Sequence, residues 1–224
     1  MAPATTRRIV RDGIAVGIAT GTYGVSFGAV SVASGLDVWQ TCALSLLAFT
    51  GASQFALAGV VSAGGTPLVA ALTGLLLGTR NTLYGIRVAP LVGWRGWRRV
   101  AASHLVIDES AAMTVTRTSR EHARAGFLAT GLSVFVLWNL ATLVGALAGA
   151  GLDPRTYGLD AAVGGAFLAL LWPRLHSSRH RVVALLGAAV ALTLVSFTPS
   201  GVPVLAAAVV ALGMGYLTRG EDDA

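Results

Sequence analysis

Four polar residues interrupt an apolar stretch in the first half of the chain. Residues 68–99 begin as a membrane span would, and the polar residues within them are Arg80, Asn81, Tyr84 and Arg87. An arginine at bilayer depth costs about 2.5–3.5 kcal/mol on insertion scales, so it normally faces protein or water. Partners are offered downstream by Asp108 and Glu109. The sequence therefore predicts a polar site where these two segments meet.

The spacing of this polar group favours one helical face. Arg80, Tyr84 and Arg87 stand at i, i+4 and i+7, which places them on the same side of a helix. We expect Arg87 to reach towards the membrane interface and Arg80 to lie deeper. Arg80 could bind the carboxylate of an amino acid, or form a fixed ion pair with an acidic side chain. Gly78, Gly85 and Pro90 make an interruption of this helix plausible.

The short amphiphilic segment 100–116 carries the acidic residues. His104 and Asp108 stand at i and i+4, which would stack them on one helical face, and Glu109 follows. Three interpretations remain open. They are a solvated surface helix, a span or re-entrant helix with a proton-active carboxylate, and a metal site.

The two apolar runs that precede this region carry further candidates. The first run covers about residues 13–33, and its glycines at three- and four-residue spacing favour close helix packing. Tyr23, Gly24 and Ser26 could alternatively line a substrate site in a broken helix. The second run, about 39–61, is expected to be a single span with Gln54 near its middle, either as a contact between helices or as a substrate contact.

The composition is that of a membrane protein. The 224 residues are 54% hydrophobic and 12% charged, whereas soluble domains average about 25% charged residues. The net charge of +6 does not indicate nucleic acid, because the arginines form short clusters between apolar runs. Such clusters are typical of cytoplasmic loops.

The chain as a whole is predicted to be all-α, a polytopic transmembrane bundle with seven or eight hydrophobic segments in a single domain, 1–224. Later spans are expected at about 127–150, 157–172, 182–197 and 202–217. A faint internal repeat would relate halves 13–116 and 127–217, with broken or re-entrant helices. The basic loops at 117–124 and 174–181 favour a cytoplasmic C-terminus, but simple alternation puts Arg95, Arg98 and Arg99 outside. Either a re-entrant 100–116 segment or a third span that doubles back near Arg80 would remove that conflict.

The chain resembles the AzlC family, the large subunits of branched-chain amino acid exporters. The resemblance depends on motifs that occur in the family's order, namely 23–29 (YGVSFGA), 49–55 (FTGASQF), 78–85 (GTRNTLYG), 107–110 (IDES) and 158–160 (GLD). One departure is Asn81, where the family usually has a histidine.

The resemblance implies a secondary transporter subunit in the inner, cytoplasmic membrane that exports branched-chain or related amino acids. It also implies a small hydrophobic partner of the AzlD type. From the residues themselves we expect Arg80 to recognise substrate and Asp108 or Glu109 to carry a proton or bind the ammonium group. The alternatives are an uncoupled channel or scaffold and, less favoured, a membrane-embedded hydrolase using Ser103 and His104. No cofactor is expected.

Overall fold

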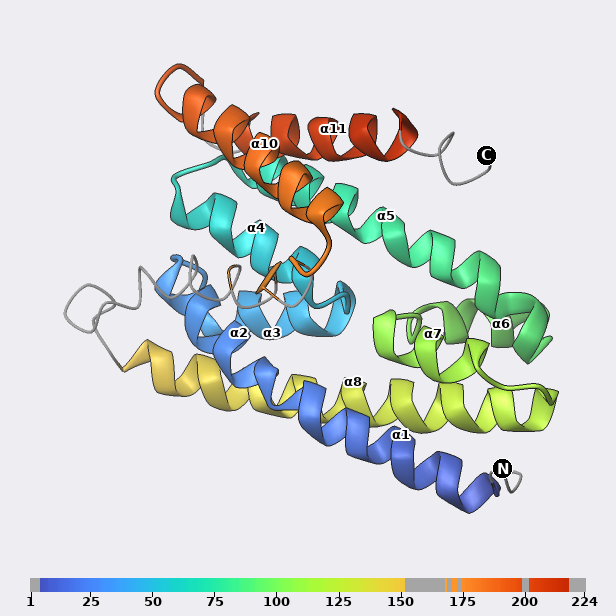
Figure 1. Ribbon diagram of the computed structural model, residues 1–224. Helices are drawn as coiled ribbons and strands as arrows, with labels where there is room; N and C mark the ends of the chain where they lie inside the picture. Colours follow the sequence, from blue (N-terminus) through green and yellow to red (C-terminus); the bar gives the residue numbers. More distant parts are fainter. Residues whose placement is uncertain (1–4, 152–167, 169–170, 173–174, 199–201, 218–224) are drawn as a thin grey trace.

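The computed structural model describes residues 5–151, 168, 171–172, 175–198 and 202–217, and all regular structure within them is helical (Figure 1). The helices are α1 (Thr6–Gly21), α2 (Tyr23–Ala33), α3 (Val38–Leu47), α4 (Ala52–Ser62), α5 (Pro67–Val92), α6 (Gly96–Ser103), α7 (Asp108–Val115), α8 (Arg120–Ala150), α10 (Ser178–Val195) and α11 (Val202–Leu217). The span expected at 157–172 and the 158–160 motif fall largely or wholly outside the described residues.

Two long apolar rods form a parallel pair. Helices α1 and α2 follow each other so closely that residues 6–33 form one candidate span, and α8 is another. The glycine stripe of the first rod packs on α8. A Cβ atom at Gly13 would meet Thr130, and one at Gly28 would meet the backbone of Thr142 and Gly145. Because the contacts advance in the same direction along both rods, the rods run parallel, and the expected close packing is confirmed.

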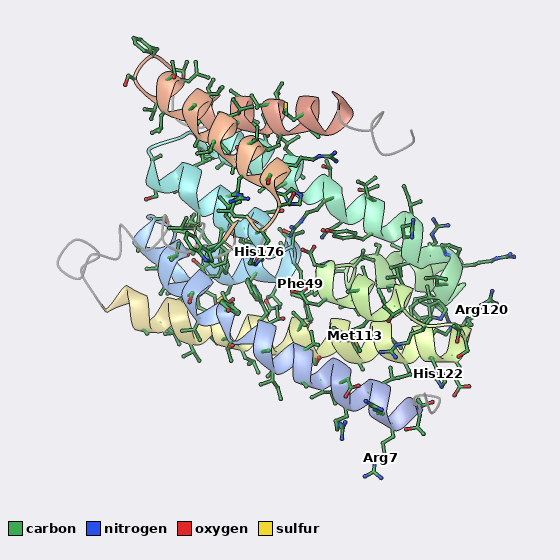
Figure 2. All side chains as sticks on the ribbon, viewed as in Figure 1. Arg7, Phe49, Met113, Arg120, His122 and His176 are labelled. Atoms are coloured by element: carbon green, nitrogen blue, oxygen red, sulfur yellow. The ribbon has the colours of Figure 1, made fainter. Side chains whose placement is uncertain are left out.

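The starts of these rods define one end of the molecule. Figure 2 shows Arg7, Arg120 and His122 towards the same end. The C-terminus of α5 joins them there, because the Arg124 Nε atom donates to the Val92 carbonyl at 2.7 Å. We call this the basic end. Its arginines are Arg7, Arg8, Arg11, Arg95, Arg98, Arg99, Arg117, Arg120 and Arg124.

Helices α3 and α4 form a first re-entrant hairpin, which enters from the opposite end. Helix α3 runs back along α8, since Ser45 bonds Thr142 and Phe49 packs on Phe135. The helix then breaks at residues 48–51, the first tip. Helix α4 returns to the end at which it entered. The expectation of a single span over 39–61 was therefore wrong.

Helix α5 runs from the opposite end to the basic end without a break. Its 26 residues give a length of about 39 Å, enough to cross a hydrocarbon core of about 30 Å. Its first half lies antiparallel to α4, with Gly78 beside Ser53 and Gly74 beside Leu57. Neither the helical glycines nor Pro90 interrupts it, so the interruption considered from the sequence does not occur.

Helices α6 and α7 form a second re-entrant hairpin, which enters from the basic end. Helix α6 leads to residues 104–107, the second tip, where Leu105 packs on Gly131. Helix α7 returns, because the Met113 carbonyl lies against Gly126 near the start of α8. Both ends of the hairpin thus lie at the basic end, which removes the conflict over the arginines of 95–99. The tip also separates His104 from Asp108, so these residues do not share one helix as the i, i+4 spacing predicted.

Helices α10 and α11 pack mainly against each other and confirm the last two apolar segments. Helix α10 is long and apolar enough to cross a membrane, whereas α11 is a shorter apolar helix. Both lie beyond α5 on the side away from α8 (Figure 1). The repeat stays a prediction, because much of its second half lies outside the described residues.

Candidate functional site

Arg80 joins the two hairpin tips. It lies halfway along α5, and its guanidinium reaches both tips at once. The Nη2 atom donates to the Thr50 carbonyl in the first tip at 3.1 Å. The Nη1 atom lies 3.3 Å from Oδ2 of Asp108, the residue that follows the second tip. We call this arrangement the Arg80 bridge.

The first tip is shaped by a glycine and an amide. Gly51 has a φ of 64°, a left-handed value that residues with a Cβ atom rarely adopt. The buried Gln54 side chain then fastens α4 to α3, because its Nε2 atom donates to the carbonyls of Leu44 and Ser45 at 3.2 and 3.4 Å. These bonds fix the turn between the two helices, so that the Thr50 carbonyl lies outside both and accepts a hydrogen bond from Arg80.

A serine shapes the second tip. The Ser110 hydroxyl donates to the Leu105 carbonyl at 2.6 Å and accepts from the Ile107 amide at 3.1 Å. Helix α7 can therefore begin directly at Asp108. Asp108 and Glu109 occupy its first turn, where the helix dipole stabilises negative charge. The carboxylate that pairs with Arg80 is thus held by the helix start as well as by the cation.

The two tips touch at the depth of Phe135, the middle residue of α8. The ring centroids of Phe49 and His104 lie 6.2 Å apart. Phe135 packs on both rings, at 5.1 Å from Phe49 and 5.5 Å from His104. Figure 2 shows Phe49 near the middle of the molecule. The polar atoms of the tips and this aromatic contact therefore lie at mid-depth, far from either end of the long helices.

The charges of the bridge are only partly buried. The side chains of Arg80 and Asp108 each keep 30% of their surface accessible. Glu109 is half-buried; it faces Thr20 of α1 and lies within electrostatic range of the Arg80–Asp108 pair. This arrangement provides one cation and two carboxylates to a polar guest.

Two of the remaining predicted residues lie beside the bridge on α5. Asn81 is half-buried, and its buried Oδ1 atom has no hydrogen-bond partner among the described residues. Tyr84 lies one turn further on and packs against the buried cluster that includes Val88 and Phe127. Arg87 is exposed, and its interfacial position stays a prediction.

The candidates of α2 are not part of the bridge. Gly24 is buried against the Trp138 carbonyl of α8 and serves helix packing. Tyr23 and Ser26 are exposed on the outside of α2. Sequence reasoning missed the Thr50 carbonyl, and the only local signal for it is the Gly51 that follows.

The chain has relatives among known membrane proteins. Residues 15–152 match the AzlC protein family. The inner membrane protein YgaZ of Escherichia coli (strain K12) is 26% identical over 201 residues, which cover 83% of this chain and 80% of that protein. An uncharacterized membrane protein of Helicobacter pylori is 24% identical over 170 residues, 75% of either chain. No solved structure matches the chain with significance. The family match covers more than half of the chain and includes both hairpins and the Arg80 bridge, and we conclude that this membrane protein belongs to the AzlC family.

Proposed function

We propose that the protein is the large subunit of a secondary transporter that exports branched-chain or related amino acids across the cytoplasmic membrane, coupled to protons. The single observation that carries this proposal is the Arg80 bridge: a guanidinium held at mid-depth by Asp108 and by a carbonyl of the opposite hairpin. A fixed ion pair would suffice to hold two helices together. Because this pair also joins two re-entrant tips, breaking and re-forming it would open and close the site between them.

The substrate would replace both halves of the ion pair. The carboxylate of an amino acid binds the Arg80 guanidinium, and its ammonium group binds Asp108. Every charge keeps a partner during the exchange, which avoids the large cost of leaving one of them unpaired in a low-dielectric site. The bidentate fork of arginine suits a carboxylate better than a lysine ammonium would.

Glu109 gives the proton a place in this scheme. It stands next to Asp108 and within electrostatic range of Arg80. A zwitterionic amino acid adds no net charge, so the proton need not bind together with it. Export driven by an inward proton gradient requires exchange: Glu109 would take up a proton from the outside when the empty Arg80–Asp108 pair re-forms, and would release it to the cytoplasm when the next substrate binds.

The orientation of the bundle in the membrane follows from the basic end. Loops rich in arginine face the cytoplasm in most membrane proteins, so we assign the basic end to the cytoplasm and the first hairpin to the outside. The resemblance to branched-chain amino acid exporters supports a small hydrophobic partner subunit of the AzlD type. A cytoplasmic C-terminus remains our assignment from the charge of residues 174–181.

The test is efflux of labelled leucine from cells that express the chain with and without the partner, and with and without an uncoupler. We expect efflux that needs the partner and collapses with the uncoupler. Efflux that survives the uncoupler would indicate a channel instead. Arg80→Gln should abolish efflux, whereas Arg87→Gln, the same change on an exposed arginine of the same helix, should leave it intact.

A further inference from the structure

A cavity of about 370 Å³ lies between α5 and α6, on the basic side of the Arg80 bridge. Its deep end is marked by Asn81, and its walls include Val88 and Val92 of α5 and Ala102 of α6. Phe127 of α8 lies behind these walls. The volume is near the lower limit of ligand pockets, which run from about 300 to 1,000 Å³. It suits a small solute.

The cavity is mainly apolar, with polar residues at its two ends. At the deep end Asn81 contributes to the lining, whereas its Oδ1 atom is buried away from the cavity. Near the basic end, the lining includes the guanidinium-bearing side chain of Arg99. An α-amino acid carries its ammonium and carboxylate groups on one carbon, so its carboxylate can bind Arg99 while the aliphatic side chain of a branched-chain member lies along the apolar walls.

The cavity is directly connected in sequence to the bridge. Asn81 follows Arg80 on α5, and the α6 wall ends at Ser103, one residue before the second tip. The basic end of the cavity is bounded by Trp94, whose ring packs edge-on against Phe127 with a centroid distance of 5.8 Å. The cavity therefore lies between the basic end and the level of Arg80 along α5.

We propose that this cavity is the access site for substrate on the basic side, and that its walls select aliphatic amino acids by size before they reach Arg80. The inference rests on the proposed export function and extends it to the residues that determine specificity. Val88, Val92 and Ala102 contact the aliphatic side chain, and Arg99 binds the carboxylate.

The test compares efflux of labelled leucine and alanine through two leucine substitutions on α6. Ala102→Leu fills the cavity, and Ala101→Leu adds the same side chain at the neighbouring exposed position, which does not line it. A pocket that changes by a few methylene groups alters discrimination by about 10-fold or more. We expect Ala102→Leu to lower the leucine-to-alanine efflux ratio by about 10-fold, and Ala101→Leu to leave the ratio unchanged.

A variant that enlarges the cavity provides a second test in case Ala102→Leu fails to fold. Val92→Ala should raise efflux of phenylalanine relative to leucine. A second matched pair tests the charged end: Arg99→Gln should raise the KM for leucine, and Arg98→Gln, whose arginine lies over the Trp97 ring and not in the cavity, should not.

The outcomes separate this inference from the function on which it rests. If the parent protein exports leucine but neither Ala102→Leu nor Val92→Ala changes any efflux ratio, the access site is refuted and the export function stands. If Ala102→Leu lowered the efflux of all amino acids equally and Val92→Ala changed no efflux ratio, the occupant of the cavity would be a lipid chain. That result would also refute the access site. A parent without amino acid efflux would refute both proposals.

Discussion

Phe49 and His104 lie ring to ring at the meeting point of two hairpins that enter the molecule from opposite ends. Neither hairpin crosses the full thickness of the helical bundle. Each presents the end of one short helix and the start of another at mid-depth, where backbone groups lack partners inside their helices. Arg80 satisfies one of these groups and pairs with the acid at the start of α7. A site between two opposed tips can be reached from either end when one tip moves.

A crosslink between the tips should stop transport. Cys42 is the only cysteine, so Cys42→Ala gives a background for Phe49→Cys with His104→Cys. We expect a short bifunctional thiol reagent to join the two cysteines, because the rings they replace are in contact. The measurement is whether fragments stay joined after cleavage at a protease site inserted into 64–66, together with leucine efflux. Phe49→Cys with Thr118→Cys at the basic end is the control and should not crosslink.

Each hairpin should expose both of its ends on one side of the membrane. We expect an impermeant maleimide to label Trp39→Cys and Ser62→Cys from outside, and Arg98→Cys and Thr118→Cys only from the cytoplasmic side. The measurement is labelling in intact cells compared with opened vesicles. Labelling of Trp39→Cys and Ser62→Cys from different sides would mean that the α3–α4 segment crosses the membrane.

Substitution of the packed glycines should be costly. Gly28→Ala would press a methyl group against the Thr142 carbonyl, and overpacking of this kind costs about 1–3 kcal/mol. We expect a lower unfolding temperature in detergent. Gly213→Ala is the matched control, because no atom of the described residues lies within 4 Å of a Cβ atom there, and removal of a helical glycine should leave stability equal or higher. Equal unfolding temperatures for the two variants would contradict the close packing of the α1–α2 rod on α8.

Gln54 should act through structure. Gln54→Leu removes the amide that ties α4 to the Leu44 and Ser45 carbonyls, at a cost of about 1–3 kcal/mol. We expect both thermal stability and efflux to fall, because the first tip loses its fastening. Gln40→Leu removes a helix-capping side chain at the far end of α3 and should spare efflux. Normal stability in Gln54→Leu would show that the amide is not structural and would favour a substrate contact.

The approach of Arg80 to Asp108 could be predicted because charge at bilayer depth needs a partner. The arginines of 95–99 likewise indicated either a re-entrant second hairpin or a third span that doubles back near Arg80, and the unbroken α5 leaves the first of these. The close packing of the first rod could also be predicted from its glycine stripe, because small residues on one face of an apolar helix allow close packing.

The first tip could not be predicted, because residues 48–51 are as apolar as the helices around them. Hydropathy does not distinguish one long span from two short helices that turn back. The break depends on Gly51 and on an amide that acts across the hairpin from Gln54. The Thr50 carbonyl is a backbone atom, which every residue carries, so side-chain types gave no indication of it.

The candidates at Tyr23 and Ser26 illustrate a different limit. A glycine in a membrane helix can mark either a break or a close contact, and the sequence of α2 is compatible with both. The deciding partner is Trp138 of α8, far away in the chain, whose carbonyl meets Gly24. That contact keeps α2 intact and leaves its polar side chains outside.

The central claim is that Arg80 exchanges Asp108 for substrate, and a charge swap tests it most directly. Arg80→Asp combined with Asp108→Arg restores an ion pair but leaves the Thr50 carbonyl without its donor and moves the cation from α5 to α7. Loss of a charged hydrogen bond costs about 1.5–3 kcal/mol, roughly 10-fold or more in affinity. The measurement is labelled leucine efflux from proteoliposomes that contain equal amounts of folded protein. We predict that the swapped protein is more stable than either single variant and exports less than about a tenth of the parent's leucine; full export by the swapped protein would show that the pair is merely structural and would contradict the account.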